Sequence, residues 1–105
     1  MQIDLYGGFG EKGRTSVGLA DSHTRILLDV GIKVGATGRE YYPVIGDAAI
    51  MSLDAVLVSH AHEDHVGGLS WLLSRGFRGR IFMTHETRGE TDGMLAEYAD
   101  PSHVR

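Results

Sequence analysis

The sequence predicts an α+β fold in which one mostly antiparallel sheet carries helices packed on one face. Two observations predict it: short apolar runs separated by glycine-rich and polar turns fill residues 3–30, and apolar residues recur at helical spacing later in the chain. The 105 residues suffice for one small domain and are too few for two, so residues 1–105 are expected to form a single domain. Hydrophobic residues at 42% and charged residues at 23% are ordinary globular usage, which excludes a disordered or fibrous chain.

The start of the chain predicts a three-stranded antiparallel meander. Residues 3–6 form a short strand, which ends where the segment 7–13 places four glycines among seven residues. Strand-forming residues resume over 15–20, and a polar turn at 21–24 leads into an apolar strand over 25–30.

The middle of the chain is less regular. Residues 33–43 show no periodicity and are expected to form a loop, whereas residues 44–51 fit a short helix or a buried extended segment equally well. The β-branched run at residues 54–59 predicts a buried strand.

The remaining elements are two helices and one strand. Apolar spacing predicts a helix that starts at Leu69 and ends at Gly76, a residue suited to the left-handed position after a helix. A strand over residues 80–84 follows, and a last helix is expected from Glu86 to about Tyr98, although two glycines weaken it.

Composition excludes several classes of protein. The net charge of −4 gives no general basic field for nucleic acid, and the chain has no cysteine, which removes disulfides, thiolate zinc sites and cysteine nucleophiles. No apolar run approaches the ~20 residues of a membrane helix and no signal peptide opens the chain, so a cytoplasmic location without membrane contact is expected. One local set of arginines is expected to be a solvated surface around a turn: Arg75, Arg78, Arg80 and Arg88.

The histidine motif, residues 60–65, carries three imidazoles and two carboxylates directly after a predicted strand. Without cysteine, these donors form the one credible ligand set for zinc, iron or manganese. In an extended segment His60 and His62 project from the same side and can reach one ion. Asp64 and His65, turning into the next helix, can reach a second position, which suits a two-metal centre with ions ~3.5–4 Å apart. A polar loop of surface histidines would not explain this density.

Three segments resemble the metallo-β-lactamase fold superfamily. Residues 60–65 match its H-x-H-x-D-H signature, Leu27-Leu28-Asp29-Val30-Gly31 is similar to its strand-ending Asp-x-Gly, and residues 54–59 are similar to the strand before the ligand loop. The start Gly7-Gly8-Phe9-Gly10-Glu11-Lys12-Gly13-Arg14-Thr15-Ser16 resembles the N-terminal part of the RNA-processing branch, the β-CASP-type exonucleases and their relatives. Residues 58–69 and 81–87 are similar to the same branch.

The resemblance implies a partial αββα sandwich, the N-terminal half of that fold. Because the second sheet of the family has no counterpart in these residues, an apolar sheet face would be left in water. We therefore expect a fragment of a longer enzyme or, failing that, a homodimer or another association through the exposed face.

The resemblance also implies a site. His60 and His62 would bind one zinc ion, Asp64 and His65 would bind a second, and Asp64 would act in catalysis by orienting a hydroxide, with manganese or iron as other metals. Asp29 would lie behind the histidines and orient a ligand imidazole; its alternative role is to cap a strand-end turn. The further metal ligands of the family have no recognisable motif here. His23 and His103 are expected at the surface, and His85, at the end of a strand, is expected at the surface or in the core, with a place in the site as its alternative.

Three functions remain open at this point. The preferred one is zinc-dependent hydrolysis of RNA phosphodiester bonds by the complete site. A hydrolase of the same superfamily that acts on a thioester, lactone or small phosphoester shares the same motif. A catalytically silent metal-binding or interaction module is the third.

Overall fold

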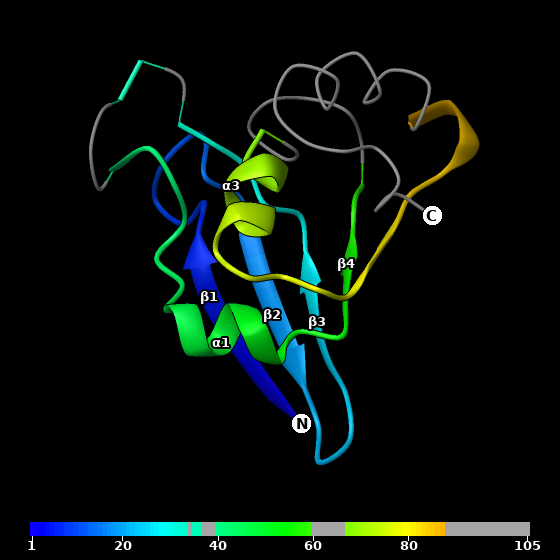
Figure 1. Cartoon of the computed structure of the whole chain (residues 1–105). Coiled ribbons are helices and arrows are strands. Elements are labelled where there is room, and N and C mark those ends of the chain that lie inside the picture. Colours follow the sequence, from blue (N-terminus) through cyan, green and yellow to red (C-terminus); the bar gives the residue numbers. More distant parts are fainter. Residues whose placement is uncertain (34, 37–39, 60–66, 88–105) are drawn as a thin grey trace.

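Five strands form one sheet, with the strands in the same order as in the sequence. Figure 1 labels the first four of them. The computed structural model describes residues 1–33, 35, 36, 40–59 and 67–87. The strands are β1 (Gln2–Gly7), β2 (Ser16–Ala20), β3 (Arg25–Leu28), β4 (Ala55–Leu57) and β5 (Arg80–Phe82).

The sheet is mixed. β1, β2 and β3 pair antiparallel, as the expected meander requires, whereas β4 joins β3 and β5 joins β4 in parallel. Parallel neighbours need a crossover rather than a hairpin, and each crossover here contains a helix: α1 (Asp47–Ser52) and α3 (Leu69–Ser74). The structure confirms the α+β class, and the two crossovers give the later strands their direction.

Both helices lie on one face of the sheet and enclose the core (Figure 1). Leu27, Val56 and Ile81 occupy the same register position on β3, β4 and β5 and are fully buried. The segment 44–51 contains α1, whose Ile50 is also fully buried in this core. Gly76 has a φ of +101° directly after α3 and its C-cap residue, which confirms the predicted helix stop.

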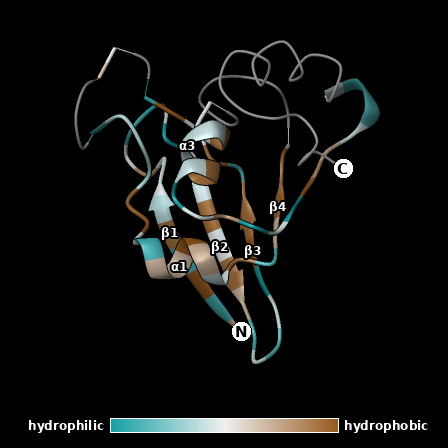
Figure 2. Ribbon diagram, viewed as in Figure 1, coloured by the Kyte–Doolittle hydropathy of each residue, from teal (hydrophilic) through white to brown (hydrophobic). Residues whose placement is uncertain are grey.

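The opposite face of the sheet carries an apolar row that crosses all five strands. Alternation along each strand places one residue per strand in this row: Leu5, Val17, Leu28, Leu57 and Phe82. Leu5 is 62% exposed, Phe82 43% and Leu57 39% within the described part of the chain. Figure 2 shows the hydrophobic character of the central strands. The expected apolar sheet face is therefore present and open among the described residues.

The C-terminal prediction is tested only at its start. Residues 85–87 are helical, whereas the rest of the helix expected to reach Tyr98 lies outside the described residues. No helix within the described ranges has the length and apolar content that crossing a membrane requires.

Replacing Phe77 by Ala is expected to lower the free energy of unfolding by about 3–5 kcal/mol, because this residue is fully buried in the hydrophobic core and the loss of its ring leaves a cavity. The exposed Phe9 provides the control: its replacement by Ala should change stability by about 0.5 kcal/mol or less. Urea unfolding followed by circular dichroism measures both. Equal losses would contradict the assigned core.

Candidate functional site

The four predicted metal ligands, His60, His62, Asp64 and His65, lie outside the described residues. Within the described ranges no group of three or more His, Asp or Glu side chains could hold a metal ion. The structure does describe both flanks of the histidine motif, Ser59 before it and Gly67-Gly68 after it. The site can therefore be built from the residues that hold these flanks.

Asp29 holds the first flank. This residue directly follows β3 and is 7% exposed, and its φ of +61° places it in the left-handed region that Asp tolerates better than most residues. The backbone N–H of Ser59 donates to Oδ1 and the Ser59 hydroxyl donates to Oδ2, both at 2.7 Å. Such charge-assisted hydrogen bonds are about twice as strong as neutral ones. The carboxylate thus fixes the residue directly before His60.

Val30 holds the second flank. Its carbonyl oxygen accepts a hydrogen bond from the N–H of Gly68 at 2.8 Å. A Cβ at position 68 would lie 2.9 Å from both Val30 Cγ2 and Val30 O, so only glycine permits this approach. Two consecutive residues at the end of β3 therefore contact both ends of the segment that carries the histidine motif.

The segment 13–16 supports this strand end from the other side. Ser16 is fully buried, and its hydroxyl donates to the carbonyl of Asp29 at 2.9 Å. The N–H of Gly31 donates to Thr15 O at 3.0 Å, and the N–H of Arg14 donates to Ile32 O at 3.2 Å. Residues 29–32 are thus held by backbone and side-chain hydrogen bonds beyond the regular strand pairing.

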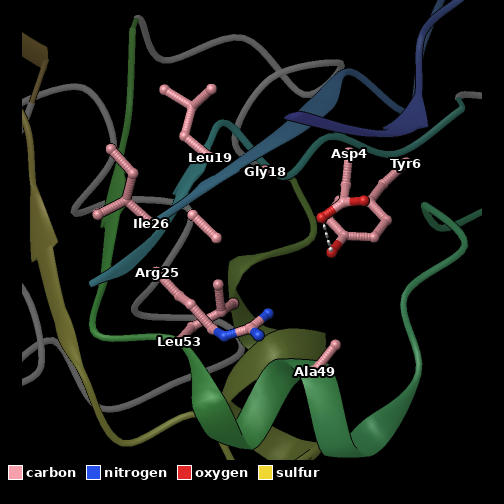
Figure 3. Close-up of a pocket in the computed structure, with 9 residues that line it drawn as sticks. Asp4, Tyr6, Gly18, Leu19, Arg25, Ile26, Ala49 and Leu53 are labelled. Carbon is pink, nitrogen blue, oxygen red and sulfur yellow. Dashed lines mark hydrogen bonds between the residues drawn. The ribbon is translucent and has the colours of Figure 1, made fainter. Parts of the chain in front are cut away.

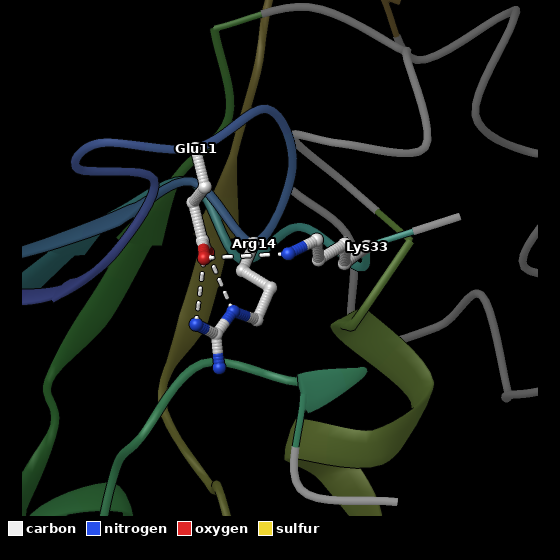
Figure 4. A network of polar contacts seen from close by, with 3 residues as sticks. All are labelled: Glu11, Arg14 and Lys33. Atoms are coloured by element: carbon white, nitrogen blue, oxygen red, sulfur yellow. Dashed lines mark hydrogen bonds and ion pairs between the residues drawn. The ribbon is translucent and has the colours of Figure 1, made fainter. Parts of the chain in front are cut away.

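A charged cluster lies at the edge of this support (Figure 4). The Arg14 guanidinium donates to Glu11 through Nε at 2.6 Å and Nη2 at 2.8 Å, and Lys33 Nζ lies 3.6 Å from Glu11 Oε2. We call these three residues the Glu11 cluster. The hydrogen bonds from Arg14, with the charges of Arg14 and Lys33 and a hydrogen bond from the Gly8 backbone, lower the pKa of Glu11 to about 2.

A small cleft lies between α1 and the first strands (Figure 3). Tyr6 lines it, and its hydroxyl donates to Asp4 Oδ2 at 3.5 Å. Burial, and then the Asp4 carboxylate, raise the pKa of Tyr6. The volume of about 10 Å³ accommodates roughly one water molecule, which is too small for a substrate.

The other candidate residues follow the expectations where the structure describes them. His23 and His85 are exposed, as are Arg75, Arg78 and Arg80, whereas His103 and Arg88 lie outside the described residues. Ser59 and Gly68 are the supporting residues whose contacts the sequence did not predict. The one sequence feature that could have indicated these contacts is that both residues lie close to the histidine motif.

Comparisons with known proteins identify similar chains. The model of the family described as "Anti-Pycsar protein Apyc1" matches residues 13–87. Cleavage and polyadenylation specificity factor 73 of Drosophila melanogaster is 35% identical over 105 residues, which are 99% of this chain and 15% of that protein. Transcription termination factor FttA of Methanothermobacter thermautotrophicus is 36% identical over 97% of this chain and 16% of its own length. Endoribonuclease ysh1 of Schizosaccharomyces pombe is 32% identical over 93% of this chain and 13% of its own length.

Solved structures share the fold. Rm3 metallo-β-lactamase superposes with a TM-score of 0.54 at 24% identity, over 84% of this chain and 34% of that chain. A Cronobacter sakazakii metallo-β-lactamase with a HARLDQ motif gives a TM-score of 0.52 at 20% identity, over 73% and 28%. The chain spans 13–16% of the length of the curated relatives named above. It belongs to the metallo-β-lactamase fold superfamily, within the family that the matching model describes, and is similar to the N-terminal part of the RNA-processing, β-CASP branch.

Proposed function

We propose that the chain forms part of a metal-dependent hydrolase that cleaves RNA phosphodiester bonds, with zinc held by the histidine motif. The observation that carries the proposal is that Asp29 and Val30 hold both flanks of residues 60–65 through hydrogen bonds of 2.7–2.8 Å. The names of the curated relatives support RNA as the substrate, since they include an endoribonuclease and a polyadenylation factor.

The donor set suits the proposed metal. Imidazole and carboxylate bind zinc in catalytic sites, and manganese and iron accept the same donors. His60 and His62 would hold one ion, and Asp64 and His65 would hold a second. The glycine at position 68 keeps side-chain atoms away from the strand end beside this segment.

The residues of this chain would then divide the work. Zinc, when bound there, would activate a water molecule for attack and offset negative charge on the phosphate. Asp64 would act as the catalytic residue by orienting that water toward phosphorus. Asp29 would fix the approach to His60 through Ser59 and limit the orientations open to the ligand imidazoles.

Single-turnover cleavage of end-labelled single-stranded RNA tests the function, with the deoxy form of the same sequence and a small phosphodiester as comparisons. We expect RNA cleavage that a chelator abolishes. It should be slow, because the chain provides the four proposed ligands and has no recognisable motif for the further metal ligands of the family. If the small phosphodiester is cleaved and the RNA is not, the result would instead favour a small-molecule hydrolase. Bound metal without cleavage of any substrate would favour a silent metal-binding module.

The metal assignment predicts the behaviour of His62→Ala. Loss of one imidazole should reduce the zinc content of the purified chain to about half, because the remaining donors around that ion are too few for stable four-coordinate binding and the second ion keeps its own donors. Elemental mass spectrometry measures the content, and His23→Ala is the matched control at an exposed position. Unchanged zinc in His62→Ala would show that the site lies elsewhere.

The role of Asp29 predicts the behaviour of Asp29→Asn. The amide keeps the shape but offers one acceptor and no charge to Ser59, so zinc affinity should fall about 10–100-fold. Titration calorimetry with zinc measures it. Asp47→Asn is the control, because Asp47 is exposed and pairs only loosely with Arg75 at 3.8 Å. Wild-type affinity in Asp29→Asn would contradict the assignment.

We further propose that the exposed apolar row pairs with the same row of a second copy of the chain in a homodimer. Leu5, Leu57 and Phe82 supply the exposed area, and soluble monomers rarely leave such a face open. Light scattering tests it: a defined dimer that Leu57→Lys dissociates supports a homodimer, whereas a stable monomer contradicts it.

A further inference from the structure

We propose that Glu11 is a positioning residue for the metal centre. Its carboxylate keeps the segment 8–16 packed against residues 29–33, and this keeps Asp29 in place to accept the hydrogen bonds from Ser59. The inference rests on the proposed function for its consequence at the metal. Among the described hydrogen bonds, none joins Glu11 to Asp29 or to Ser59 and Gly68, the flanks of the histidine motif. Its effect must therefore pass through the support of the strand end.

The Glu11 cluster joins the two segments directly. Glu11 belongs to the glycine-rich loop, and its two hydrogen bonds to Arg14 form a planar fork between guanidinium and carboxylate. Lys33, on the far segment, adds the ion pair at 3.6 Å. The Glu11 side chain is only 17% exposed, so this pairing is better shielded than an ordinary surface ion pair.

The loop needs such a fastening because its backbone is unusual. Arg14 has a φ of +55°, a conformation that non-glycine residues rarely adopt. At the preceding Gly13, φ is +109° and an added Cβ would lie 2.9 Å from Lys33 Cα, so the two backbones are in close contact. The fork from Glu11 holds the Arg14 side chain and helps to keep its backbone in this conformation.

Residues 14–16 connect the Glu11 cluster to the residues that follow β3. Arg14 N–H donates to Ile32 O, Thr15 O accepts from Gly31 N–H, and Ser16 Oγ donates to Asp29 O, at 3.2, 3.0 and 2.9 Å. Asp29 in turn accepts both hydrogen bonds from Ser59. A continuous set of hydrogen bonds thus connects the Glu11 cluster to the residue before His60.

The charge of Glu11 persists over the working pH range. Because its pKa is lowered to about 2 from an ordinary value of 4.5, the stabilisation from the ion pair is complete above about pH 4.5 and disappears only as the pH falls through about 2. The cluster therefore remains intact across the neutral pH range.

Amide hydrogen exchange in the metal-free chain, followed by NMR, tests the inference with Glu11→Gln. We expect exchange at Gly31 and Ser59 to accelerate at least tenfold, since both N–H groups depend on the held segment. Val58, whose N–H donates to Phe82 O within the sheet, should keep its rate. Zinc affinity by calorimetry should fall about three- to tenfold, and Asp47→Asn should change neither quantity.

Several results would overturn the inference. Unchanged exchange at Gly31 and Ser59 in Glu11→Gln, or equal acceleration at Val58, would show that the cluster has no local role. Faster exchange with unchanged zinc affinity would exclude positioning of the metal. If Glu11→Gln does not fold, Arg14→Lys, which keeps the charge but loses the fork, carries the same comparison. A wild-type chain without zinc affinity would contradict the proposed function, and exchange would still decide whether Glu11 holds the strand end.

Discussion

The end of β3 holds both flanks of the histidine motif, and this constraint organises the described structure around it. Asp29 binds Ser59 through both carboxylate oxygens, and the next residue, Val30, accepts the N–H of Gly68. A segment with fixed ends has fewer conformations to lose, so under the proposed function part of the ordering cost would be met before a metal ion binds. The positive φ of Asp29 is a strained backbone conformation, and the surrounding hydrogen bonds maintain it.

The rest of the fold keeps that strand end in place. The core under α1 and α3 fixes β3 and β4 side by side, so that Leu27 and Val56 share one register position. From the opposite direction, residues 14–16 and the Glu11 cluster hold residues 29–33. The apolar row on the opposite face is exposed at Leu5, Leu57 and Phe82 in the described part of the chain. The helix-covered face of the sheet thus supports the candidate site, and the opposite face stays partly exposed among the described residues.

Local patterns predicted much of this structure. The three antiparallel strands, the buried strand before residue 59 and the stop at Gly76 follow from alternation, β-branched runs and a glycine after a helix, all of which act over a few residues. The segment 44–51 stayed ambiguous because its helix depends on burying Ile50 under the sheet. The partner of Asp29 lies 30 residues away, and sequence spacing contains no information on such a contact. The same holds for Lys33 beside Glu11.

The central claim, that the histidine motif held by the end of β3 binds zinc, is tested most directly by X-ray absorption at the zinc edge on the chain loaded with one equivalent. Because the chain contains no cysteine, the account predicts a shell of nitrogen and oxygen at about 2.0–2.1 Å, with the outer-shell scattering of at least two imidazoles. A shell of oxygen without imidazole scattering would contradict it, since zinc would then be bound by carboxylates and water elsewhere on the protein.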